Sequence, residues 1–132
     1  MTNCGGKKPI PSQWITIPGM LTVAELPEFI RGVTKLLSES ERQDLIRYVA
    51  LHPKAGDLMV GTGGVRKLRW RRGDQGKSGG VRVIYYFYDE SMPLYLITLF
   101  SKGDQVNLSK AERNELMSMT DALVQIWKGR NL

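Results

Sequence analysis

The sequence predicts an α+β domain in which an N-terminal helical hairpin and a C-terminal helix pack against a twisted antiparallel sheet. Three observations lead to this fold class. Two segments with helical hydrophobic spacing come first, three strand-like runs with short connections follow, and a third helical segment comes last. No internal repeat and no linker interrupts this order, so residues 20–132 are expected to form a single domain.

The helical hairpin is expected in the segment 26–52. Apolar residues recur at helical spacing through its first half, and Pro27 suits a first helical turn. Ser38 and Glu41 have the spacing of a capping box, which places the start of a second helix there. The second helix must end before Pro53. The short link between the two helices predicts that they are antiparallel.

Three strands are predicted in the middle of the chain, at Val65–Trp70, Val81–Tyr88 and Leu94–Phe100. Alternation along the first of them places Lys67 and Arg69 on the same face. The other two are rich in β-branched, aromatic and other apolar residues, which is typical of strands near the centre of a sheet. Their short connections predict an antiparallel meander.

The last helix is predicted to begin at a second capping box, formed by Ser109 and Glu112. One stripe of this helix is apolar and carries a methionine, and a core face is the favoured interpretation over a binding groove. The residues of this stripe are Leu116, Met119, Leu123 and Trp127.

Residues 1–19 are interpreted as an N-terminal extension of unknown role. They include three prolines and two adjacent glycines, with a short strand expected at Trp14–Ile17. Because this extension lacks helical periodicity, we expect a chain that starts at Met20 to fold and to remain active.

The cysteine and histidine content excludes several classes of protein. Cys4 is the single cysteine and His52 the single histidine, so neither a disulfide framework nor a His/Cys zinc cluster can form. His52 is interpreted as a cap at the end of a helix. No apolar run approaches the roughly 20 residues of a membrane span, and no signal peptide is apparent. A cytoplasmic protein without membrane association, metal or cofactor is expected.

The positive charge is concentrated between Gly61 and Arg82. This stretch holds seven basic residues and one acid, a net charge of +6 that equals the formal charge of the whole 132-residue chain. Cations interleaved with glycines and Trp70 suit a surface that replaces counterions along a phosphate backbone. By charge alone, a solvated basic hairpin is an equally good interpretation.

The segment Gly76–Ser78 does not belong to a phosphate-binding P-loop. Arg71 occupies the position that the P-loop reserves for its first glycine, and a predicted strand follows where a helix is needed. No Ser/His/Asp set is suggested, and the carboxylates are scattered among helix caps and turns. The chemistry that remains is cationic.

Two groups of residues are candidates for contact with nucleic acid. The meander brings four basic residues towards one surface, and these are the candidates for stabilising charge on a phosphate: Lys67, Arg69, Arg82 and Lys102. The candidates for binding the polymer are Arg66, Arg71, Arg72, Lys77 and Tyr86. For Arg66 the alternatives are a structural role or a contact with ribosomal RNA, because it alternates with Lys67. For Tyr86, packing in the core or on the sheet is the favoured alternative.

Four blocks of sequence are more specific than the charge pattern. They read G-D-L-M-V-G-T-G-G-V-R-K-L-R-W from position 56, G-K-S-G-G-V-R-V-I-Y-Y-F from 76, L-Y-L-I-T-L-F-S-K from 94 and N-L-S-K-A-E-R from 107. These blocks resemble the RelE/HigB superfamily of type II toxins, and especially its HigB-like branch. The resemblance extends from about residue 21 to residue 127 and leaves out the N-terminal extension.

The resemblance implies a microbial RNase-like RelE fold and an endoribonuclease (mRNA interferase) activity. Members of the superfamily usually cleave messenger RNA in the ribosomal A site without a metal, by attack of the ribose 2′-OH on the adjacent phosphate. It also implies a cognate antitoxin and contacts with ribosomal RNA. Operator DNA is expected to be bound only through the antitoxin complex.

The resemblance assigns roles to the basic residues of the strands. Lys67 and Arg69 match the two basic residues that follow the glycines, Arg82 matches the arginine that opens the next strand, and Lys102 matches the basic residue after the last central strand. Some members carry a tyrosine a few residues after this basic residue. The corresponding position in this sequence lies near Leu108, and no tyrosine is present there. The general base is therefore unassigned. Lys67 is the candidate, since flanking arginines disfavour its positive charge.

Two other interpretations of function remain open. One is a catalytically weakened relative that binds RNA or ribosomes without cutting, which the absent tyrosine favours. The other is a DNA-operator co-repressor that acts only with its antitoxin, because net positive charge suits DNA equally well.

Overall fold

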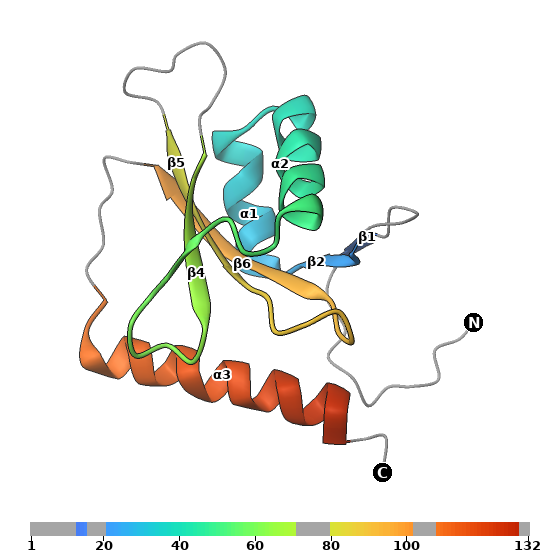
Figure 1. Cartoon of the computed structure of the whole chain (residues 1–132). Helices are drawn as coiled ribbons and strands as arrows, with labels where there is room; N and C mark the ends of the chain where they lie inside the picture. The colour runs from blue at the N-terminus through green and yellow to red at the C-terminus, as the bar shows by residue number, and fades with distance from the viewer. Residues whose placement is uncertain (1–12, 16–20, 71–79, 102–107, 130–132) are drawn as a thin grey trace.

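The structure is a computed structural model, and it describes residues 13–15, 21–70, 80–101 and 108–129. It confirms the α+β class with its N-terminal helical hairpin and C-terminal helix (Figure 1). The described elements are β1 (Gln13–Ile15), β2 (Val23–Glu25), α1 (Pro27–Leu36), α2 (Glu39–Leu51), β3 (Asp57–Leu58), β4 (Val65–Trp70), β5 (Val81–Tyr86), β6 (Leu94–Ser101) and α3 (Lys110–Lys128).

The strands form one six-stranded sheet in the order β1-β2-β6-β5-β4-β3. The predicted meander β4-β5-β6 is present and antiparallel throughout. One pair departs from the expected antiparallel sheet, because β2 runs parallel to β6 with Val23 opposite Leu94. Both helices of the hairpin and the strands β3 to β5 lie between these two strands in the chain. This long crossover allows parallel pairing, which a tight turn does not.

Local chemistry sets the helix boundaries where the sequence predicts them. In both capping boxes the serine side chain accepts a hydrogen bond from the backbone N–H three residues on, and the glutamate accepts one from the serine N–H. Pro27 occupies the first position of α1, and α2 ends at Leu51, ahead of Pro53. His52 is the C-cap residue of α2, as expected.

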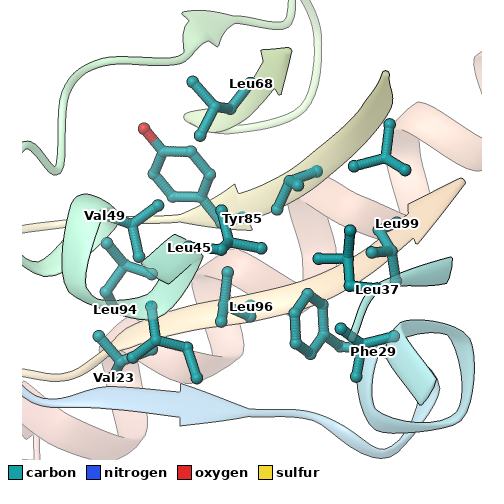
Figure 2. Packing of buried hydrophobic residues seen from close by; sticks show 14 of the residues in the cluster. Val23, Phe29, Leu37, Leu45, Val49, Leu68, Tyr85, Leu94, Leu96 and Leu99 are labelled. Atoms are coloured by element: carbon teal, nitrogen blue, oxygen red, sulfur yellow. The ribbon is translucent and has the colours of Figure 1, made fainter. Parts of the chain in front are cut away.

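One side of the sheet carries the main hydrophobic core, against the hairpin α1–α2. Figure 2 shows Phe29, Tyr85 and Leu96 pointing into this core from α1, β5 and β6. Gly32 lets α1 approach β6 closely, since an added Cβ would lie 2.9 Å from Cδ2 of Leu99. The hairpin therefore covers much of this face of the sheet.

A buried ion pair ties β2 to α2. The carboxylate of Glu25 is fully buried and accepts two hydrogen bonds from the guanidinium of Arg42, at 2.6 and 2.8 Å. The guanidinium of Arg42 also donates hydrogen bonds to the carboxylate of Glu39, so its positive charge is paired with two carboxylates. Removing one partner of such a pair is costly, because it leaves an uncompensated buried charge.

The other side of the sheet is covered in part by α3, which crosses it as a separate layer (Figure 1). The guanidinium of Arg113 donates a 2.6 Å hydrogen bond to the carbonyl of Val60. Near the other end of α3, the indole of Trp127 donates to the hydroxyl of Tyr95 at 2.7 Å. These two contacts hold α3 at both ends, and its apolar stripe faces a core, as predicted.

The glycine-rich turn before β4 packs closely against the middle of α3. Gly63 has φ of +81°, and an added Cβ would lie 2.5 Å from the hydroxyl oxygen of Thr120. A side chain at this position would therefore be strained and would also push α3 away.

No helix of the described residues is long and apolar enough to cross a membrane.

Candidate nucleic-acid interface

Strand pairing brings three of the predicted cations onto one face of the sheet. Across β4 and β5, Lys67 is opposite Ile84, and Arg69 is opposite Arg82. Ile84 belongs to the core beneath α3, so the side chains that share its face project to the α3 side. We call Lys67, Arg69 and Arg82 together the cationic face of the sheet.

The cationic face is open to solvent to different degrees along the two strands. Arg69 is exposed, while Lys67 and Arg82 are half-buried. The guanidinium of Arg82 lies beside Gly80, where an added Cβ would be 3.6 Å from Nη1, an ordinary van der Waals contact. Within the described part of the chain, none of these three cations is in an ion pair.

A groove of about 510 Å³ adjoins the cationic face, between the sheet and the first half of α3. We call it the α3 groove. Buried or half-buried apolar side chains form its floor, among them Ile84, Ile97 and Met119. Lys67 lines it as well and is therefore common to the groove and the cationic face.

The α3 groove also contains acidic residues that no pattern in the sequence connects with a site. Glu28 from α1, and Glu112 and Glu115 from α3, are exposed at its edge. Leu108, near which the family tyrosine is absent, lines the groove too. The capping box gives Glu112 a local role, and no spacing in the sequence links it to Glu28, which is more than eighty positions away.

Arg66 lies on the opposite face of β4, as its alternation with Lys67 predicts. Its Nη1 donates hydrogen bonds to the carbonyls of Gly56 at 2.7 Å and Lys54 at 3.2 Å. Its Nε is buried without a hydrogen-bond partner among the described residues. The guanidinium thus holds the loop that leads into β3. The geometry favours the structural alternative for Arg66 over contact with RNA.

Tyr86, the aromatic candidate for stacking on a base, is placed in the core beneath α3. Its side chain is 3% exposed, and burial raises the pKa of its phenol. A base cannot reach this ring while α3 is in place. The packing alternative is the one that the geometry supports.

Four candidates fall outside the described residues. Arg71, Arg72 and Lys77 follow β4 in the chain, and Lys102 follows β6 directly. Their positions in sequence connect them to the strands that carry the cationic face, and their roles remain predictions.

Three aromatic rings pack against one another on the hairpin side, and two of them, Tyr48 and Trp70, line a small pocket together with Arg69. Tyr48 lies between His52, at 4.8 Å between ring centroids, and Trp70, at 5.3 Å. His52 thus has a packing role in addition to its cap position. In the described part of the chain, no group of three or more His, Cys, Asp or Glu side chains is placed to hold a metal ion.

The fold and the cationic face define a class of protein: a small α+β domain whose sheet carries three cations on one face. Residues 39–130 match the family described as the RelE toxin of the RelE/RelB toxin–antitoxin system. The match runs from α2 to the end of α3 and includes the whole cationic face. This chain belongs to the RelE toxin family, and membership implies an antitoxin as its partner.

Proposed function

We propose that this toxin is a ribosome-dependent, metal-independent mRNA endonuclease of the HigB-like branch that acts in the cytoplasm and inhibits translation. The observation that carries the proposal is the cationic face. Arg69 and Arg82 are directly opposite each other, and Lys67 is two residues from Arg69 on the same side. Two like charges at opposed positions are unfavourable unless an anion lies between or above them, and RNA supplies that anion.

The proposed reaction is an internal transesterification of the RNA. The ribose 2′-hydroxyl gives its proton to an acceptor as its oxygen attacks the adjacent phosphorus, the bond from phosphorus to the 5′-oxygen breaks, and the leaving oxygen takes up a proton. The products carry a 2′,3′-cyclic phosphate and a 5′-hydroxyl. Negative charge builds up on the phosphorane, so fixed cations bind the transition state more strongly than the ground state.

The residues of the cationic face take different roles in this proposal. Arg82 binds the phosphorane oxygens through its two-pronged guanidinium, and Arg69 is opposite it on the neighbouring strand. Lys67 lines the adjoining groove and is proposed as the proton acceptor. Lys102 is proposed to add a fourth cation.

The loop cations have a separate role in the proposal. Arg71, Arg72 and Lys77 bind the backbone of messenger or ribosomal RNA, which positions the substrate without selecting a sequence. Operator DNA is bound only by the complex with the antitoxin.

Transcript mapping tests the proposed activity directly. The full chain is induced in bacteria, and the 5′ ends of transcripts are mapped across the transcriptome. Growth arrest with new 5′ ends inside translated frames supports the nuclease. Growth arrest without such ends supports the second candidate, a relative that binds RNA or ribosomes without cutting, which the absence of the family tyrosine near Leu108 favours.

Substitution of Arg82 tests the mechanism. Arg82→Ala is expected to lower the cleavage rate about 10²–10³-fold while the fold is retained, which is typical for loss of one preorganised donor. Arg82→Lys should restore only part of the rate, because a point charge does not reproduce the guanidinium geometry. Full toxicity of a folded Arg82→Ala variant, or inhibition by EDTA with intact ribosomes, would exclude this mechanism.

A further inference from the structure

A small pocket lies beside the end of β4, remote from the α3 groove. It has a volume of about 270 Å³ and is lined by Tyr48 from α2 and by Leu68, Arg69 and Trp70 from β4. Arg69 projects to the other face of the strand, so a pocket lined by all three consecutive residues runs along the backbone edge of β4. The inner edge is paired with β5 throughout. We call this site on the outer edge the edge pocket.

The backbone of β4 has no partner strand at the edge pocket. β3 pairs with β4 only as far as Lys67, and no other described strand follows on that side. The carbonyl of Val65 accepts the N–H of Met59 and therefore points to the outer edge. Because successive residues of an antiparallel strand point their N–H and C=O alternately to the two sides, those of Lys67 and Arg69 point outward too. Arg69 thus presents one donor and one acceptor at the pocket.

The aromatic residues of the edge pocket are only partly used in packing. Tyr48 is 36% exposed and Trp70 is half-buried, whereas Leu68 is buried in the main core. The two rings contact each other, with centroids 5.3 Å apart and planes tilted by 50°. A ligand therefore stacks on their exposed surface and does not insert between them. Among the described residues, neither the phenol of Tyr48 nor the indole N–H of Trp70 has a hydrogen-bond partner.

We propose that the edge pocket binds one base of an RNA whose phosphate lies on the cationic face, an inference that rests on the proposed function. Arg69 is common to both sites: its side chain belongs to the cationic face, and its backbone borders the pocket. The base and the phosphate of a nucleotide are joined by a single ribose, so one residue can contact both. Single-stranded RNA is commonly bound in this way, by stacking on aromatic rings and hydrogen bonds to the base edge.

The size of the edge pocket favours a single base over a larger ligand. Its 270 Å³ are below the roughly 300–1,000 Å³ that are typical of pockets for a whole small molecule. A peptide strand is also less suitable, because its affinity comes from a row of main-chain hydrogen bonds. Only Arg69 among the three residues of β4 beyond Lys67 points its N–H and C=O outward. One donor and one acceptor are enough for the edge of a base.

This pocket would add base recognition to a surface that otherwise contacts phosphates. Cations on a phosphate backbone position the polymer and carry no sequence information. Each of the four bases has a donor next to an acceptor, so the backbone of Arg69 can pair with any of them. The larger ring system of a purine covers more of Tyr48 and Trp70. A preference for a purine beside the bound phosphate is therefore expected.

A double-mutant cycle between Tyr48 and the base tests the proposal. The affinity of the full chain is measured for a 2′-O-methyl adenine trinucleotide and for versions with one abasic position. One abasic position should weaken binding by at least about fivefold, the lower limit for loss of a base–aromatic stack. Tyr48→Ala should cause the same loss with the complete RNA and no further loss with that abasic RNA. Tyr48→Phe keeps the ring and should bind normally. Tyr88→Ala, an exposed tyrosine outside the pocket, is the matched control.

Amide exchange locates the base independently. The backbone N–H of Arg69 should exchange more slowly with the complete RNA bound than with the abasic RNA bound. Independent effects of Tyr48→Ala and the abasic position, or unchanged exchange at Arg69, overturn the proposal. If the affinity depends on Arg82 but on no base, the inference fails while the cationic face is still supported as an RNA site. If the wild type binds neither RNA, the inference and the proposed function both fail.

Discussion

Arg69 and Arg82 are directly paired across β4 and β5, with both side chains on the face that α3 leaves partly open. Like charges at such positions destabilise a sheet, and within the described chain no carboxylate neutralises either one. The free protein therefore contains an unfavourable pair of charges. Under the proposed function, a bound RNA phosphate would neutralise this pair, so that the two arginines lower the stability of the free protein and favour RNA binding.

A non-cleavable RNA is accordingly expected to stabilise the protein. A short 2′-O-methyl RNA lacks the attacking hydroxyl and, at ten times its Kd, should add about 1.4 kcal/mol to the free energy of unfolding. Arg69→Ala and Arg82→Ala should lose most of this gain, yet be at least as stable as the wild type without RNA at low salt. Thermal unfolding measures both effects. Arg47→Ala, an exposed arginine on α2, is the control, and equal RNA stabilisation of all variants would contradict the assignment.

Arg66 is expected to behave in the opposite way. Arg66→Ala removes its hydrogen bonds to the carbonyls of Lys54 and Gly56, and hydrogen bonds from a charged donor contribute about 1.5–3 kcal/mol. The variant should unfold at lower urea concentration and bind the same 2′-O-methyl RNA with unchanged affinity once folded. A loss of RNA affinity without a loss of stability would return Arg66 to the RNA-binding residues.

Gly63→Ala should loosen α3. The positive φ at this position costs an alanine about 1–3 kcal/mol, and its Cβ would collide with the hydroxyl of Thr120. Urea unfolding should show the lower stability, and faster amide exchange in Lys110–Lys128 should show that α3 is displaced. Gly129→Ala, whose backbone is helical and whose added Cβ meets nothing closer than 3.4 Å, is the control and should have little effect.

The buried phenol of Tyr85 makes the free energy of unfolding depend on pH in the alkaline range. Its hydroxyl accepts the N–H of Gly56 and donates to the carbonyl of Pro53, both at 2.8 Å. Burial raises the pKa of Tyr85, although the Gly56 hydrogen bond acts in the other direction. Its stabilisation is complete below the ordinary tyrosine pKa of about 10 and is lost as the pH rises through the raised pKa.

Tyr85→Phe should therefore cost about 1–3 kcal/mol at neutral pH, because the N–H of buried Gly56 loses its hydrogen-bond partner. The variant should also show a shallower loss of stability above pH 10, where Tyr86 and Tyr95, whose pKa values burial also raises, still contribute. Urea unfolding from pH 7 to pH 11 provides the measurement. Tyr88→Phe removes an exposed hydroxyl and should match the wild type.

A chain that starts at Met20 is expected to fold and to keep its toxicity. Truncation removes β1, which pairs only with the three residues of β2 at the edge of the sheet. The expected cost is below the roughly 2–5 kcal/mol that truncating a large core side chain to alanine causes. Urea unfolding and growth assays decide the point. A larger loss of stability would make residues 1–19 part of the domain.

Most of the fold follows from local signals in the sequence. The two capping boxes, Pro27 and the alternation of Val65–Trp70 are short-range patterns, and each one has the predicted structure. The strand β3 is not predictable in this way, because two residues among glycines carry no period that a pattern can reveal. β5 ends at Tyr86, two residues before the predicted end, and the chain then turns towards β6.

The candidate site was less predictable because it depends on distance in space. Alternation correctly placed Lys67 and Arg69 on one face and Arg66 on the other, since the period of a strand is a local property. The opposition of Arg69 and Arg82 needed the register of two strands. The burial of Tyr86 needed the position of α3. Neither the strand register nor the position of α3 can be predicted from residues that are close in sequence.

The sequence by itself determined the α+β class, the ends of the helices, the concentration of charge and the family to which the chain belongs. These depend on hydrophobic period, capping chemistry and composition, which act over a few residues. Only the tertiary structure decided that β2 runs parallel to β6 and that Glu28, Glu112 and Glu115 meet Lys67 around an apolar groove. Side chains from three elements come together there because the sheet and two helices pack against one another, and no local preference specifies that packing.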